Sequence, residues 1–205
     1  MAQEAGKELR DGLKALADGS LLMLVSYIVL GLGFFMLPLL RFSMMPFRRV
    51  ASSTPVQFTV YSGFAIAVVV LGVALTLYAV LGRLSSGLRL LSAWRGDLSG
   101  LSPLVVWGLG LGFILLGLGA MFFAFAWPGR WIILVLSFIA LVVGYIGVGV
   151  TGLKLGTYLN SSTFTLGGAF ALISSVLPLF APVAWLIMYV EASGQSARVA
   201  THASV

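Results

Sequence analysis

Side chains that could do acid–base or metal chemistry are few in this sequence and stand far apart. The single histidine, His202, lies three residues from the C-terminus, and no second imidazole could help it to hold a metal ion. No cysteine is present. The carboxylates are Glu4, Glu8, Asp11, Asp18, Asp97 and Glu191. Because no two of them can be argued to share a buried site, we predict no catalytic residue, no metal site and no cofactor.

Glycines at helical spacing are the strongest positive feature. Two sets recur in this way: Gly108, Gly112 and Gly119 in "LVVWGLGLGFILLGLGAMFFAF", and Gly144, Gly152 and Gly156 in "GYIGVGVTGLKLG". Small residues at such spacing let helices approach closely in lipid, where hydrophobic burial does not drive association. We therefore expect either close packing of two helices of this chain or a seam with a partner protein.

A predicted break interrupts the last apolar run, "FTLGGAFALISSVLPLFAPVAWLIMYV", at Ser174, Pro178 and Pro182. Each proline frees a carbonyl one turn earlier, which hydroxyl groups, water or a neighbouring helix must satisfy. We predict a kink near Ser174 to Pro178. Broken helices form substrate sites in many transporters, but a single break with no charge nearby is more often plain structure.

The elements that carry these residues are transmembrane helices. The sequence is 60% hydrophobic and only 9% charged, too few charges to coat a soluble domain. Five apolar runs without a charged residue cover roughly 20–40, 56–82, 104–126, 131–153 and 164–190. Each is long enough to cross a membrane. A backbone in lipid must satisfy its hydrogen bonds within the segment, and the runs lack the alternation of barrel strands, so we expect α-helices. We predict an all-α integral membrane protein with five transmembrane helices in a small bundle at 19–190. Polar side chains within these runs, namely Ser26, Tyr27, Thr76, Tyr78 and Tyr145, are expected to form hydrogen bonds between helices.

The two ends of the chain are polar. Residues 1–18 repeat apolar side chains at Ala5, Leu9, Leu13 and Leu16, a pattern typical of an amphipathic helix on the membrane surface. Asp18, Gly19 and Ser20 are expected to break it before the first span. The alternative is a solvated helix that docks on the protein's own loops. Residues 191–205 are expected to form a disordered tail.

Basic residues flank the spans singly and form no basic stripe, which argues against nucleic-acid binding. We predict headgroup contacts on one side at Lys14, Arg89 and Lys154, and on the other at Arg48, Arg49 and Arg130. Five spans would divide the Lys and Arg residues seven to five, which favours a cytoplasmic N-terminus and an external C-terminus in the cell membrane.

Gly-Leu-basic recurs as "GLKAL", "GLRLL" and "GLKLG" from Gly12, Gly87 and Gly152. The pattern fits a repeated helical hairpin, although it is short enough to arise by chance in a chain rich in leucine and glycine.

Together with "LGRLSSGLRLL" and the closing "GLKLGTYLNSSTFTLGGAFALISSVLPLFAPVAWLIMYV", this alternation resembles archaeal multi-span membrane proteins of domain-of-unknown-function families. The resemblance implies a multi-span membrane fold and no particular site residues.

The combined features predict a non-catalytic membrane protein that serves as an accessory or scaffold subunit of a larger membrane complex. Its expected partners are membrane lipids and other membrane subunits, or further copies of the same chain in a homo-oligomer. The alternative is a transporter or channel for an uncharged or lipid-like solute.

Overall fold

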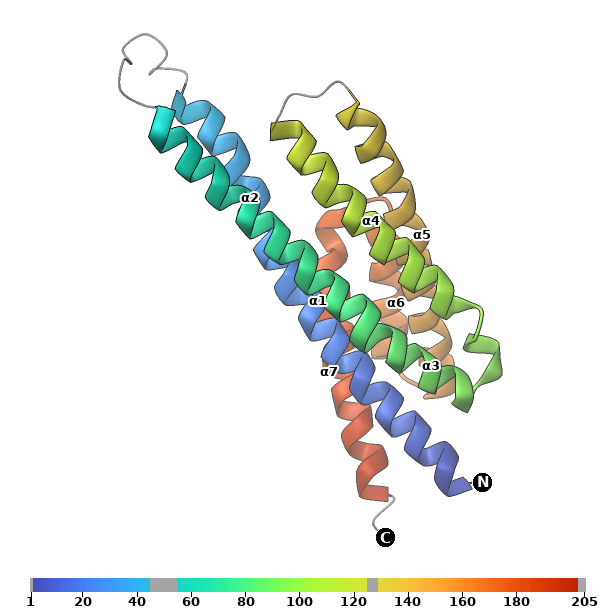
Figure 1. The fold of residues 1–205 in the computed structure, drawn as a ribbon. Coiled ribbons are helices and arrows are strands. Elements are labelled where there is room, and N and C mark those ends of the chain that lie inside the picture. Colours follow the sequence, from blue (N-terminus) through green and yellow to red (C-terminus); the bar gives the residue numbers. More distant parts are fainter. Residues whose placement is uncertain (1, 45–54, 125–128, 203–205) are drawn as a thin grey trace.

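The structure, a computed structural model, describes residues 2–44, 55–124 and 129–202, which are arranged as a bundle of helices (Figure 1). In chain order its elements are α1 (Ala2–Met44), α2 (Pro55–Leu77), the π-helical turn η2 (Tyr78–Leu84), α3 (Ser85–Trp94), the 3-10 turn η3 (Gly96–Leu98), α4 (Leu101–Ala124), α5 (Arg130–Tyr158), α6 (Ser162–Ser174), the 3-10 turn η4 (Pro178–Phe180) and α7 (Ala181–His202). No strand occurs within the described ranges.

Four helical stretches of the described residues are long and apolar enough to cross a membrane. They are Gly6–Phe35, Gly63–Trp94, Gly96–Phe122 and Trp131–Tyr158. The prediction of an all-α membrane protein is therefore confirmed at the level of fold class. The first four predicted spans fall within these stretches apart from their ends, whereas the predicted fifth span does not appear as one long helix.

The first helix is continuous from Ala2 to Met44, so the predicted break between residues 18 and 20 is wrong. Gly19 and Ser20 are buried, and the Ser20 hydroxyl donates to the carbonyl of Leu16 at 2.8 Å inside the helix. The inner part of the expected apolar face does not lie on lipid either. Leu13 and Leu16 are fully buried within the chain, because α1 packs there against α3 and α7.

The second predicted span does not end at residue 82. The helix passes through η2 into α3 and continues from Pro55 to Trp94. Two copies of the Gly-Leu-basic pattern meet where α3 crosses α1, because a Cβ added to Gly87 would lie 2.9 Å from the backbone nitrogen of Leu16 and 3.1 Å from the carbonyl oxygen of Gly12. Arg83 pairs with Asp18 at 3.8 Å across the same crossing. Contact with α1 thus stabilises a helix in a stretch that its charges had left outside the predicted spans.

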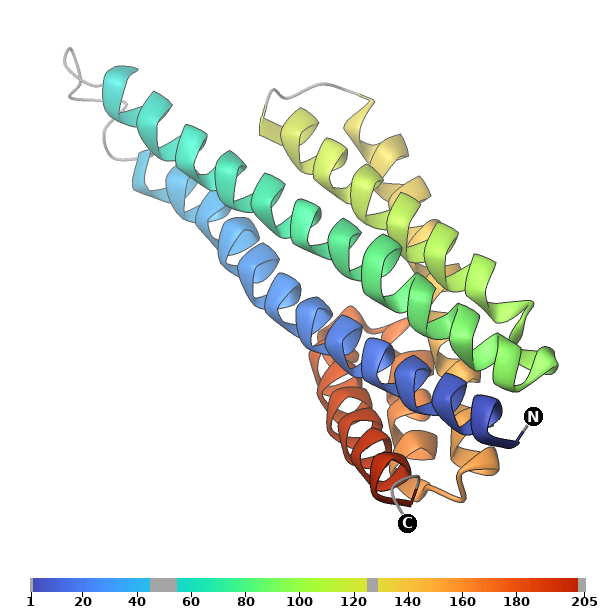
Figure 2. The same ribbon diagram turned by 60° about the horizontal axis from the view of Figure 1, so that its bottom comes forward.

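The predicted fifth span, 164–190, is instead a hairpin of two shorter helices. α6 runs antiparallel to α5, and α7 then returns antiparallel to α6 and to α1 (Figures 1 and 2). Both termini therefore lie at the same end of the bundle (Figures 1 and 2). The expected disordered tail is also corrected, because α7 remains helical through His202. Ala192 is fully buried, and the Ser196 hydroxyl donates to the carbonyl of Arg10 at 3.3 Å.

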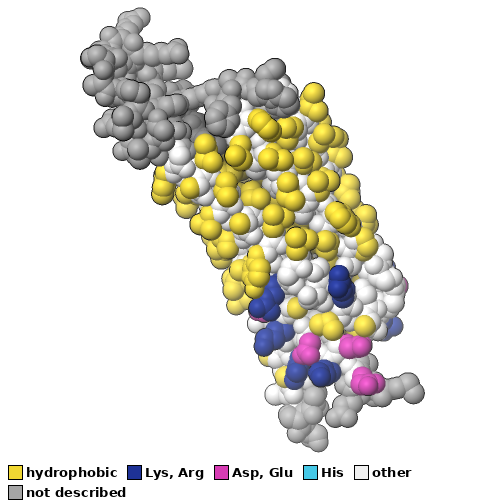
Figure 3. Space-filling model, viewed as in Figure 1, with side chains coloured by type: hydrophobic (Ala, Val, Ile, Leu, Met, Phe, Trp, Pro, Cys, Tyr) yellow, Lys and Arg dark blue, Asp and Glu magenta, His cyan; other side chains and the backbone are white. Residues whose placement is uncertain are grey.

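Charge and apolar surface are separated along the bundle. On the face seen in Figure 3, Lys, Arg, Asp and Glu side chains gather at the end that holds the termini, and hydrophobic side chains cover the described surface above them. Large apolar residues on the long sides are more than half exposed, among them Ile28, Trp107 and Ile132. Lipid, which is itself apolar, is the environment that such a surface suits.

Candidate functional site

The hairpin of α6 and α7 turns about halfway along the membrane-length helices. α6 has 13 residues and is therefore roughly 20 Å long, whereas a hydrocarbon core is about 30 Å thick. The turn is level with the middle of α5, because the Trp185 ring nitrogen, just after the turn, donates to the hydroxyl of Tyr145 at 3.4 Å. Tyr145 stands at the centre of the span-length stretch Trp131–Tyr158. The hairpin enters from the charged end and returns to it.

Polar side chains fasten the open end of this hairpin. Ser161 caps α6 by accepting the amide of Phe164 at 3.2 Å, and its hydroxyl donates to Glu191 of α7 at 2.7 Å. Gln195 donates to the same carboxylate oxygen at 2.8 Å. Burial of Glu191 by itself would raise its pKa, but these hydrogen bonds, a further one from Thr163 and the charge of Arg198 outweigh it and lower the pKa. Glu191 is therefore held as a carboxylate that joins the two helices.

Glycines bring α6 close to α5. A Cβ added to Gly152 would lie 2.7 Å from the Cα of Gly168, and one added to Gly156 would lie 2.8 Å from the backbone nitrogen of Thr165. Such distances are too short for any side chain at these positions. The predicted packing residues Gly152 and Gly156 thus lie in a seam within this chain, between a spanning helix and the hairpin.

The other predicted packing glycines lie between α4 and α5. A Cβ on Gly108 would lie 2.5 Å from the Cα of Gly144, so the two backbones are in direct contact. Gly112 and Gly119 face leucine side chains of α5, Leu141 at 2.7 Å and Leu134 at 2.6 Å from the added Cβ. All four glycines are covered by helices of the same chain and are not available to a partner.

The turn of the hairpin is formed at the predicted break. The Ser174 hydroxyl donates to the carbonyl of Phe170 and the Ser175 hydroxyl to that of Leu172, each at 2.7 Å. Residue 178 is proline, so the Ser174 carbonyl lacks the amide that would bond it in a continuing helix. The carbonyls of Ser174 and Val176 receive no backbone donor from the residues that the structure describes. Pro182, also predicted at the kink, lies in the first turn of α7, where a missing amide is tolerated.

The tip of the hairpin, residues 176–180, is apolar and exposed. Leu179 is 87% exposed and Val176 71% exposed, and Leu177 is also exposed. Irregular backbone does not face lipid within a hydrocarbon core, because each unsatisfied polar group there costs several kcal/mol. An exposed tip at this depth therefore has to contact protein or water in place of lipid.

A polar cluster ties the hairpin to the spanning helices just beside the tip. The hydroxyls of Tyr27 and Tyr145 share a hydrogen bond between α1 and α5, and Trp185 of α7 donates to Tyr145. The ring of Tyr27 also meets that of Phe113 edge-on at 5.7 Å. Of the five polar residues expected to bond between helices, Tyr27 and Tyr145 do so.

The other three of those polar residues behave differently. Ser26 and Thr76 donate to carbonyls one turn earlier in their own helices, at 2.7 Å and 2.9 Å. Tyr78 is more than half exposed.

The basic residues predicted to touch headgroups take different roles. Lys154 pairs with Asp97 at 3.2 Å and so joins the end of α5 to η3. Arg89 is exposed on α3, and Lys14 is exposed beside α7. Arg48 and Arg49 lie outside the described residues, as does the side chain of Arg130, whose backbone begins α5.

Comparison with known proteins leaves the hairpin and the cluster as the main guides to function. No protein-family model matches the sequence, and no curated protein and no solved structure is significantly similar to it. Within the described ranges, no group of three or more His, Cys, Asp or Glu side chains is placed to hold a metal ion.

Sequence reasoning missed two features of this region. It did not connect Trp185 with Tyr145, because their 40-residue separation follows no local pattern. It also treated Glu191 as the start of a disordered tail. The available signal for a continuing helix was the carboxylate itself, which directly follows the apolar run ending in "LIMYV".

Proposed function

We propose that this protein is a non-catalytic accessory or scaffold subunit of a larger membrane assembly, and that the tip of the α6–α7 hairpin contacts a neighbouring protein chain. The observation that carries this proposal is the exposed tip at mid-depth, with Leu179 at 87% exposure beside two carbonyls that receive no backbone donor from the described residues. A protein neighbour would remove both the irregular backbone and those carbonyls from lipid.

The glycine contacts between α4, α5 and α6 also support the tip as the surface that contacts a partner. Because α4, α5 and α6 pack through them inside the chain, these glycines need no partner protein to cover them. The tip is left as the surface that needs one.

Photo-crosslinking tests the proposal directly. With p-benzoylphenylalanine in place of Leu179, irradiation of native membranes is expected to give a protein adduct heavier than the 21.7 kDa chain. An adduct of twice this mass would identify a second copy, and any other mass would identify a different subunit.

The matched control is the same substitution at Trp107, which is 73% exposed on the regular helix α4 and adjoins Gly108 at the level of Gly144. We expect only lipid adducts at this position. If position 179 also gave only lipid adducts, the tip would face lipid and the proposed interface would be wrong.

The second candidate is a transporter or channel for an uncharged solute. Helices that end and turn inside a membrane line substrate paths in many transporters, and α6, with 13 residues, ends in such a turn. In that case the tip would be covered by water. Since the protein has no natural cysteine, Leu179→Cys would then react with a membrane-impermeant maleimide, whereas a protein-covered tip would not.

The distribution of basic residues supports an orientation. With the C-terminus at the same end as the N-terminus, that end carries Lys7, Arg10, Lys14, Arg83, Arg89, Arg95, Lys154 and Arg198, and of the other basic residues in the described ranges, Arg41 and Arg130 stand near the opposite end. The excess of Lys and Arg favours a cytoplasmic location for the end with both termini. This arrangement replaces the external C-terminus that five spans would require.

A further inference from the structure

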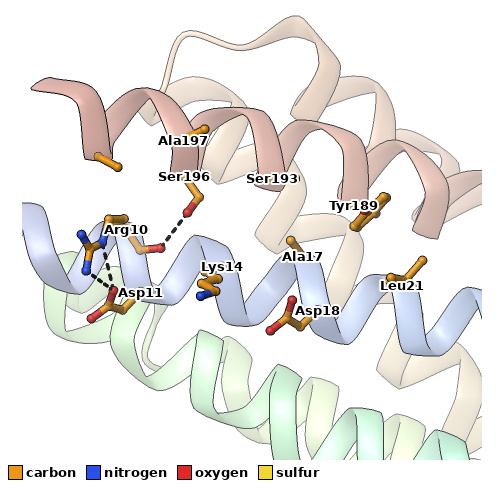
Figure 4. Close-up of a pocket in the computed structure, with 11 residues that line it drawn as sticks. Arg10, Asp11, Lys14, Ala17, Asp18, Leu21, Tyr189, Ser193, Ser196 and Ala197 are labelled. Carbon is orange, nitrogen blue, oxygen red and sulfur yellow. Dashed lines mark hydrogen bonds and ion pairs between the residues drawn. The ribbon is translucent and has the colours of Figure 1, made fainter.

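A groove of about 530 Å³ lies between α1 and α7 at the charged end of the bundle (Figure 4). We call it the α1–α7 groove. Its lining includes Lys14, Asp18 and Leu21 of α1 and Tyr189, Ser193 and Ser196 of α7. It lies well away from the hairpin tip and is independent of the interface proposed there.

The groove changes from polar to apolar along its length. Because the Ser196 hydroxyl bonds to the carbonyl of Arg10 and the helices are antiparallel, the outer end lies at Arg10 and the inner end at Leu21 and Tyr189. Arg10 and Leu21, the α1 residues at the two ends, are roughly 16 Å apart along the helix. A tyrosine at the inner end, close to the first apolar residues of the span, is typical of the headgroup level of a membrane.

Part of the polar lining is already engaged. Arg10 pairs with Asp11 at 3.1 Å and Asp18 pairs with Arg83 at 3.8 Å. Lys14, by contrast, forms no ion pair with any residue that the structure describes, and the hydroxyls of Tyr189 and Ser193 have no hydrogen bond in the same ranges. An ammonium group and two hydroxyl donors are thus open in one groove, a set that suits an oxyanion such as phosphate.

An apolar stripe continues from the inner end of the groove. Leu21, Val25, Ile28 and Leu32 of α1 follow one another at helical spacing on the face that also carries Lys14 and Asp18. Ile28 is 57% and Leu32 58% exposed. A ligand that fills the groove therefore meets polar donors at one end and a lipid-facing stripe at the other, as an amphipathic molecule would.

We propose that the α1–α7 groove binds one membrane lipid with a phosphate-bearing headgroup. The phosphate accepts hydrogen bonds from Lys14, Tyr189 and Ser193, and an acyl or isoprenoid chain lies along the stripe from Leu21 to Leu32. The acidic side chains Asp11 and Asp18 stand beside the same groove and favour a headgroup that also carries hydroxyl or amino groups.

Native mass spectrometry of the purified full-length protein, titrated with short-chain phosphatidylglycerol, tests this site. We expect one lipid to bind well before any others. Lys14→Gln should weaken this first binding about tenfold, the loss of roughly one charge-assisted hydrogen bond. Lys14→Arg should retain it, and Tyr189→Phe, which removes only a hydroxyl, should weaken it less than Lys14→Gln does.

Arg89→Gln is the matched control, because Arg89 is exposed at the same end of the bundle but lies on α3, outside the groove. It removes the same charge and should leave the first binding within about twofold. An equal loss of lipid affinity in both variants would show that the lipid is attracted by the positive charge of this end and not by a specific site. That result would overturn the proposal. So would inorganic phosphate that displaced the lipid at equal concentration, since the ligand would then be a free anion.

Discussion

Single polar side chains within the membrane region bond inside the protein. The hydroxyl of Tyr145 is the centre of the largest such group, because it bonds to Tyr27 and accepts from Trp185. Tyr145 is 2% exposed and Trp185 1% exposed, so neither can turn to water if a partner is lost. A buried polar group without a partner is costly, and these three residues therefore hold α1, α5 and α7 in one arrangement.

Replacement of Tyr145 by phenylalanine tests this group at the residue scale. Tyr145→Phe leaves both Tyr27 and Trp185 without their partner and should lower the free energy of unfolding by about 1–3 kcal/mol. Tyr27→Phe leaves the Trp185 bond intact and should cost about 0.6 kcal/mol, the average for one hydrogen bond between transmembrane helices. Unfolding of the detergent-solubilised protein in SDS would measure both.

Tyr78→Phe is the control for that measurement, since Tyr78 is 56% exposed and the change should leave stability within about 0.5 kcal/mol. A Tyr145→Phe protein as stable as this control would mean that the cluster does not hold the helices.

At the scale of elements, the composition of the sequence predicts that the chain is helical and lies in a membrane. Where each helix begins and ends depends on contacts between elements. Apolar runs without charges predict spans because lipid excludes other structures. α3 lies outside the predicted spans because Arg83, Arg89 and Arg95 interrupt the apolar sequence after residue 82. It is helical because Leu88 and Leu91 are buried at its crossing with α1, a contact between segments about 75 residues apart that local sequence does not reveal.

The hairpin was missed for a related reason. A run from 164 to 190 is long enough for one span and equally long enough for two half-length helices with a turn, so its length does not decide between them. Ser174 and Pro178 correctly marked where the chain departs from helix. The direction that the chain takes after the break depends on the hydrogen bonds of Trp185 to α5 and of Ser196 to α1. Glycine spacing was more informative, since Gly108, Gly112 and Gly119 all face α5.

Two glycines of α4 give a matched test of the α4–α5 seam. Gly108→Ala would place its Cβ 2.5 Å from the Cα of Gly144, whereas a Cβ on Gly110 would meet no atom within 4 Å. We expect Gly108→Ala to destabilise the protein by about 1–3 kcal/mol, since the backbones must separate. Gly110→Ala should be neutral or should stabilise the helix by up to about 1 kcal/mol. Thermal unfolding in detergent would measure both changes, and equal stability of the two variants would contradict close backbone contact.

At the scale of the whole molecule, the hairpin determines where the chain ends. Four membrane-length stretches return the chain to the end where it began, and α6 and α7 enter and leave at that same end (Figure 1). All six carboxylates and eight of the twelve basic residues then share one end. There the Ser196 hydroxyl of α7 donates to the carbonyl of Arg10 in α1, which ties the two terminal helices to each other.

Cysteine labelling in sealed, right-side-out vesicles tests this arrangement. Gly6→Cys and Gly194→Cys are suitable because an added side chain meets no atom within 4 Å at either position, and Gly129→Cys lies in the turn before α5 at the other end. We expect a membrane-impermeant maleimide to label position 129 at once, and positions 6 and 194 only after the vesicles are opened. Labelling of position 194 together with 129, but not of position 6, would put the two termini on opposite sides of the membrane. Residues 164–190 would then have to cross the membrane as a complete span. Immediate labelling of 6 and 194 without 129 would keep the hairpin but reverse the orientation that the basic residues favour.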